Sequence, residues 1–89
     1  DERAKRFLEE AIEKVQAHGL SREFAHRLVD HVFDREVGEP EQESGGVMLS
    51  FLLLDLIAGI DTRNAGLKEL ARVNDIKDLV REKQKTKIR

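Results

Sequence analysis

Acidic side chains gather at two places in the chain, and their spacing suits a divalent cation. Glu9, Glu10 and Glu13 fall within five residues of one another, and Glu43 lies near the start of another helical segment. At about 100° per residue, Glu10 and Glu13 lie about 60° apart on neighbouring turns of a helix, so both carboxylates can reach one ion. Mg²⁺ and Mn²⁺ prefer such oxygen ligands. The competing interpretation is a solvated face whose acids form ordinary ion pairs with basic neighbours.

Two successive glycines, Gly45 and Gly46, follow Glu43 inside a segment that is otherwise helical in pattern. Each glycine costs a helix on the order of 1 kcal/mol relative to alanine. The pair predicts either a neighbouring helix that packs very close or a ligand that needs the backbone. The positive end of the helix also suits phosphate oxygens. Both interpretations stay open.

Other polar residues could contact a substrate. His26 and Asp30 lie one turn apart in the second helical segment, where a nucleotide contact competes with ordinary surface polarity. Four basic residues line the later part of the fourth segment and could reach phosphates: Arg72, Lys77, Arg81 and Lys83.

The end of the chain is basic. Residues 77–89 contain six basic and two acidic residues. Three interpretations compete: a solvated helix end whose cations complement the helix dipole, phosphate contacts made from one subunit to another, or a weak nucleic-acid-binding arm. We expect residues 84–89 to fray.

Helices must position these residues, because apolar side chains recur at three- and four-residue steps and no strand alternation occurs. The pattern predicts helices over residues 4–19, 21–33, 40–58 and 61–81. The expected ends carry typical start and stop residues: Gly19, Ser21, Pro40, Gly59 and Asp61. Short joints between four helices predict an all-α antiparallel bundle, with residues 1–89 as a single domain.

The third predicted helix is nearly all apolar over residues 47–60 and contains Asp55. These 14 residues are fewer than the roughly 20 that a membrane span needs, so we expect a buried helix and no membrane partner. One 89-residue bundle can hardly surround such a helix. We therefore expect a homodimer or homotetramer that sandwiches it, with a missing N-terminal helix as the competing explanation. Asp55 must pair, sit at a subunit seam or face a ligand.

Composition narrows the chemistry. The chain has no cysteine, which excludes disulfides and thiolate metal sites. Charged residues make up 38% of it, yet the net charge is only -2, so no overall field indicates nucleic acid as the partner. The heavily charged start excludes a signal peptide within these residues, and we expect a cytoplasmic protein.

The same acidic segments carry a family resemblance. Residues 7–17 resemble the first metal-binding helix of MazG-type all-α nucleoside triphosphate pyrophosphohydrolases, with Glu10 and Glu13 filling the E-x-x-E motif. Residues 43–48 resemble the second motif, E-x-x-D, at the start of the next core helix. Residues 37–48, with residues 69–72 later, are similar to small MazG-like proteins of bacteriophages and prophages. The similarity covers nearly the whole chain, and it implies a short segment preceding Asp1.

The resemblance implies an activity. Such enzymes hold Mg²⁺ through the two motifs, hydrolyse a nucleoside triphosphate between its α and β phosphates, and assemble as dimers or tetramers. It implies that Glu10, Glu13 and Glu43 are metal ligands and that Glu9 supports them or orients the attacking water. It also implies a purine deoxynucleotide substrate such as dGTP or dATP, with His26 near the base.

This chain departs from the family at one ligand. Gly46 stands where the second motif has its aspartate. Either Glu39, one turn before Glu43, or water fills the place. The alternative is a catalytically silent helical module that binds a nucleotide or a protein.

Overall fold

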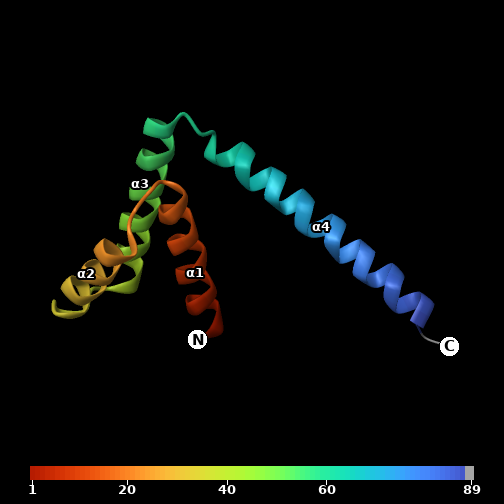
Figure 1. The fold of residues 1–89 in the computed structure, drawn as a ribbon, viewed down its shortest axis with the longest axis horizontal. Helices are drawn as coiled ribbons and strands as arrows, with labels where there is room; N and C mark the ends of the chain where they lie inside the picture. The colour runs from red at the N-terminus through yellow and green to blue at the C-terminus, as the bar shows by residue number, and fades with distance from the viewer. Residues whose placement is uncertain (88–89) are drawn as a thin grey trace. The chain divides into compact units, whose positions relative to one another are not determined.

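The computed structural model describes the backbone of residues 1–87 and the side chains of residues 1–79 and 81. Four helices follow one another: α1 (Glu2–Ala17), α2 (Arg22–Phe33), α3 (Pro40–Ala58) and α4 (Thr62–Lys87) (Figure 1). No strand occurs among the described residues, so the predicted all-α class is confirmed. The chain divides into two compact units, Asp1–Gly38 and Glu39–Arg89. Their packing into one domain stays a prediction.

Side-chain caps set the helix ends of the first unit. Asp1 accepts a hydrogen bond from the backbone N–H of Arg3 at 2.7 Å, so α1 begins earlier than predicted. Gly19 follows α1 with a φ of 91°, a left-handed conformation that favours glycine. The Ser21 hydroxyl then accepts from the N–H of Phe24 at 3.1 Å and caps α2. The predicted joint between these two helices is confirmed.

The second unit begins and turns where the sequence predicts. Pro40 occupies the first turn of α3, and Gly59 ends that helix with a φ of 72°. The Asp61 carboxylate accepts from the N–H of Asn64 at 3.0 Å at the start of α4. From there α4 continues to Lys87, six residues beyond the predicted end at Arg81. No glycine or proline follows Gly66 to interrupt it.

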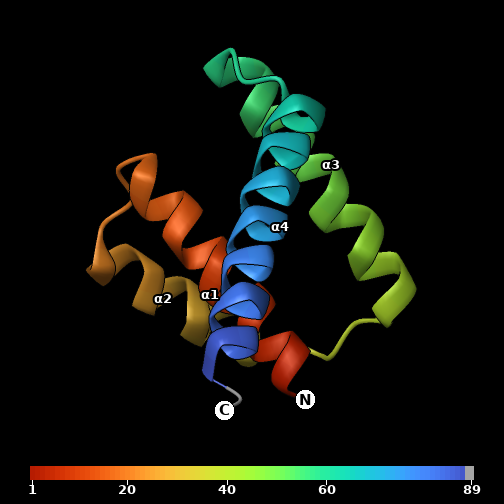
Figure 2. The ribbon, with the colours of Figure 1, turned by 90° about the vertical axis from the view of Figure 1, so that its right-hand side faces the viewer.

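A sharp corner separates α3 from α4 within the second unit. The chain direction changes by 100° across the break after Ala58. Figure 1 shows this corner, and Figure 2 shows the same helices from the side. Antiparallel neighbours in a four-helix bundle lie only about 20° off antiparallel. α3 and α4 therefore do not form an antiparallel pair, and the complete bundle stays a prediction.

Apolar side chains remain exposed in both units. Among the residues with described side chains, Asp55 alone is buried, at 2% exposure. The exposed apolar residues of α3 lie around its whole circumference: Val47, Met48, Leu49, Phe51, Leu52, Leu53, Leu56 and Ile57. The apolar neighbours that were predicted to bury α3 are not found within its own unit, among the described residues.

Among the described residues, no single helix combines the length and the apolar composition that a membrane span needs. α3 and α4 meet that test only together, across the 100° corner.

Candidate functional site

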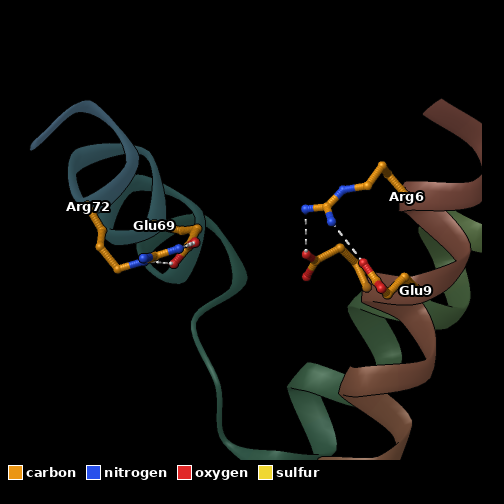
Figure 3. A network of polar contacts seen from close by, with 5 residues as sticks. Arg6, Glu9, Glu69 and Arg72 are labelled. Carbon is orange, nitrogen blue, oxygen red and sulfur yellow. Dashed lines mark hydrogen bonds and ion pairs between the residues drawn. The ribbon is translucent and has the colours of Figure 1, made fainter. Parts of the chain in front are cut away.

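The acidic face of α1 is organised by a basic side chain one turn earlier. Arg6 places Nη1 2.8 Å from Oε1 of Glu9 and Nη2 3.8 Å from Oε1 of Glu10 (Figure 3). The guanidinium thus lies between two carboxylates that reach it from the next turn. All three side chains are solvent-exposed, so each ion pair is screened and weak. Exposed acids paired with a basic neighbour are what the solvated-face interpretation predicts, and the carboxylates of Glu9 and Glu10 also remain accessible to a cation.

Glu13 extends this face by one more turn. It is exposed, and it follows Glu10 by three residues in an uninterrupted helix. Residues at this spacing are neighbours on the helix surface. The backbone of α1 therefore places Glu10 and Glu13 on the same side of the helix, as predicted. Two carboxylates alone make an incomplete octahedral site, and the remaining ligands must come from water, a phosphate or another segment.

Glu43 lies at the start of α3, in the other unit. Its N–H donates to the carbonyl of Glu39 at 2.9 Å, in the first turn. Its side chain is exposed. The expected meeting of Glu43 with the acids of α1 stays a prediction, because the two residues belong to different units.

Glu39 has a local role at the same place. Its carboxylate caps α3 by accepting from the N–H of Gln42 at 2.9 Å. Replacing that contact with a metal ion would remove a cap, typically worth about 1 kcal/mol. The cap uses Oε2 of Glu39, and the predicted role of this carboxylate in place of the aspartate absent at Gly46 stays a prediction.

Gly45 and Gly46 lie in the second turn of α3. A Cβ atom added at either position meets nothing within 4 Å. Within this unit no neighbouring helix packs against the two glycines. Close packing by another helix and access to the backbone both stay predictions.

His26 and Asp30 lie one turn apart on α2, and both side chains are exposed. On the same helix, the Arg27 guanidinium lies 5.3 Å above the ring centre of Phe24. That contact was not anticipated, although the three-residue spacing of Arg27 and Phe24 permits it. The roles of His26 and Asp30 toward a substrate stay predictions.

Arg72 is held by Glu69 on the same helix. Its Nε lies 3.1 Å from both carboxylate oxygens, and Nη2 lies 2.5 Å from Oε1 (Figure 3). These hydrogen bonds lower the pKa of Glu69 below its ordinary value. A phosphate would compete with Glu69 for the same donors. The three-residue spacing of the two residues is the sequence signal for this pair.

The other basic candidates on α4 are exposed. Arg81 Nη1 lies 4.0 Å from Oδ1 of Asp78, at the limit of an ion pair. Lys77 is exposed one turn earlier. The tail interpretations concern mainly residues 82–89, whose side chains lie outside the described ones.

Asp55 is the buried polar residue that the sequence singled out. Its Oδ2 accepts a hydrogen bond from the Thr62 hydroxyl at 2.7 Å. The sequence predicted that Asp55 needs a partner but did not identify Thr62. The signal was present, since Gly59 and Asp61 mark a tight turn between the two residues.

The described residues bring part of the predicted site together. Arg6 joins Glu9 and Glu10, and α1 places Glu13 beside Glu10. Within either unit, the described part contains no group of three His, Asp or Glu side chains placed to hold a metal ion.

Family models, curated proteins and solved structures were compared with this chain, and none of them matches it. The MazG resemblance therefore depends on the motifs at Glu10, Glu13 and Glu43 and on the order of the helices.

Proposed function

We propose that this chain is a metal-dependent nucleoside triphosphate pyrophosphohydrolase of MazG-like type, which releases a nucleoside monophosphate and pyrophosphate. The observation that carries the proposal is the exposed acidic face of α1, where Glu10 and Glu13 are neighbours and Glu9 stands beside them. The E-x-x-E resemblance assigns metal binding to this same face. A purine deoxynucleotide such as dGTP or dATP is the proposed substrate, by resemblance alone.

The residue types fit the proposed cofactor. A triphosphate carries about four negative charges near neutral pH, and a bound Mg²⁺ would neutralise charge that develops on the leaving oxygen. Carboxylates are the ligands that Mg²⁺ and Mn²⁺ prefer. Glu10 and Glu13 would bind the ion, Glu43 would complete the ligand set, and Glu9 would accept a hydrogen bond from the attacking water. The proposed substrate contacts are His26, Asp30, Arg72, Lys77 and Arg81.

We place the proposed activity in a homodimer or homotetramer. The support is the apolar surface of α3, which is exposed around its whole circumference in its own unit. A helix of this kind needs apolar neighbours on several sides. Assembly would also let Glu43 of one copy approach the acids of another.

A pyrophosphate-release assay with Mg²⁺ and a panel of NTPs and dNTPs tests the activity. We expect turnover, and we expect Glu10→Gln, Glu13→Gln and Glu43→Gln each to reduce kcat/KM by about 100-fold, because each removes a charged ligand without changing shape. Glu23→Gln is the matched control, since Glu23 is an exposed acid on α2. A folded chain that hydrolyses none of the nucleotides would contradict the proposal.

The second candidate is a silent helical module that binds a nucleotide or a protein. Gly46 favours it, because this position supplies no side-chain ligand. Calorimetric titration with Mn²⁺ and a non-hydrolysable nucleotide separates the two candidates. Binding in the absence of hydrolysis supports the silent module, whereas hydrolysis removes it.

A further inference from the structure

The corner between α3 and α4 is closed by three kinds of contact. Gly59 ends α3 in a left-handed conformation, and the N–H of Ile60 returns to the carbonyl of Asp55 at 2.9 Å. Asp61 caps the start of α4 through the N–H of Asn64. Between the two helices, the Thr62 hydroxyl donates to the Asp55 carboxylate at 2.7 Å.

The last of these contacts differs from the others because it spans the turn between the two helices. The Ile60 contact belongs to the end of α3, and the Asp61 cap belongs to the start of α4. Only the Asp55–Thr62 hydrogen bond, among these contacts, joins a side chain of one helix to a side chain of the other. Rotation of α4 about residues 59–61 would separate the two side chains.

Burial makes that separation costly. Asp55 is 2% exposed, and Thr62 is half-buried. A buried carboxyl oxygen that loses its hydrogen-bond donor is not compensated by water. Orientations of α4 that break the bond are therefore disfavoured.

We infer that the Asp55–Thr62 hydrogen bond is a lock that holds α4 at its 100° corner and prevents it from folding back along α3. The inference does not depend on the proposed activity. It has a consequence for assembly: with α4 held away, the apolar surface of α3 must be covered by helices other than α4 of the same unit.

Pulsed electron–electron distance measurements test the lock. The chain has no cysteine, so Gln42→Cys and Asp78→Cys give two defined spin-label sites, both exposed and on different helices. With the 100° bend and a rise of 1.5 Å per residue, we expect a backbone separation of about 30 Å. An α4 folded back along α3 would bring the two sites within about 10 Å. Dilution with unlabelled protein removes distances between copies.

The lock is removed by Thr62→Val, which keeps the side-chain shape and lacks the hydroxyl. We expect a distance distribution that broadens toward shorter values by about 10 Å or more. Thr62→Ser retains the hydroxyl and is the matched control, with an unchanged distribution. Thr62→Ala replaces the valine variant if circular dichroism shows that the latter has lost its helices.

Two outcomes would overturn the inference. One is an unchanged distribution in the valine or alanine variant. The other is equal broadening in Thr62→Ser, which would show that the hydroxyl is not the cause.

Discussion

Arg6 forms ion pairs with two of the acids on α1. Its guanidinium lies 2.8 Å from Glu9 and 3.8 Å from Glu10, so a cation that binds Glu10 must compete with it. Exposed ion pairs of this type contribute roughly 0.2–1 kcal/mol. Removal of Arg6 should therefore leave the metal ligands freer while increasing the repulsion between the acids, which a cation relieves.

We predict that Arg6→Gln binds Mn²⁺ about two- to five-fold more tightly than the unmodified chain, which is the affinity change that the ion-pair energy implies. Isothermal titration or the electron spin resonance signal of free Mn²⁺ measures it. Arg3→Gln removes the same charge from the same helix, where Arg3 pairs with Asp1, and should have little effect. Equal effects of the two variants would mean that net charge, and not the contact with Glu9 and Glu10, controls binding.

Glu69 provides a pH-dependent contribution to α4. Hydrogen bonds from Arg72 lower its pKa, so the folded chain favours the ionised carboxylate more than the unfolded chain does. This contribution is fully present above the unfolded pKa of about 4.3 and is lost as the pH falls through the lowered folded value. We predict that Arg72→Gln raises the pKa of Glu69 toward its ordinary value, as measured by the carboxyl carbon shift during a pH titration. Arg63→Gln, another exposed arginine of α4, should leave it in place.

At the scale of elements, short-range signals were sufficient to place the helices. Ser21, Pro40, Gly59 and Asp61 act within a turn of their own position, and each performs its predicted role. The end of α4 was not predicted, because a polar sequence made of good helix formers carries no stop signal after Arg81. The angle between α3 and α4 was also not predictable, because it depends on the partner that Asp55 finds across the turn.

The left-handed backbone of Gly59 makes the end of α3 sensitive to substitution. An L-residue at its φ of 72° is strained, so Gly59→Ala should lower the free energy of unfolding by about 1 kcal/mol. Gly66→Ala is the opposite case, because Gly66 lies inside α4 and an added Cβ meets nothing within 4 Å. It should raise the free energy of unfolding by up to about 1 kcal/mol. Urea denaturation followed by circular dichroism measures both, and the prediction fails if the two variants change stability in the same direction.

At the scale of the whole molecule, the sequence places the acids on their helices but not the helices around an ion. Glu10 and Glu13 share a face because they share a helix, which three-residue spacing alone predicts. Glu43 starts a different helix in a different unit, so its distance from them depends on packing between units. Such packing is determined by which apolar surfaces meet, and a helix that is apolar all round, as α3 is, gives no direction for it.

The exposed apolar surface of α3 predicts an interface between copies of the chain. Leu56 and Ile57 are 73% and 85% exposed on α3, so a charge at either position does not disturb packing within the unit. A charge would be costly in an apolar interface between copies. We predict that the unmodified chain sediments as a dimer or tetramer and that Leu56→Glu or Ile57→Glu raises the dissociation constant by about 100-fold or more, equivalent to roughly 3 kcal/mol.

Val37→Glu introduces the same charge at a loop residue that is 99% exposed, and it should not alter assembly. Sedimentation velocity over a range of concentrations, with circular dichroism to verify the helices, decides the matter. A helical chain that sediments as a monomer throughout that range would contradict the prediction.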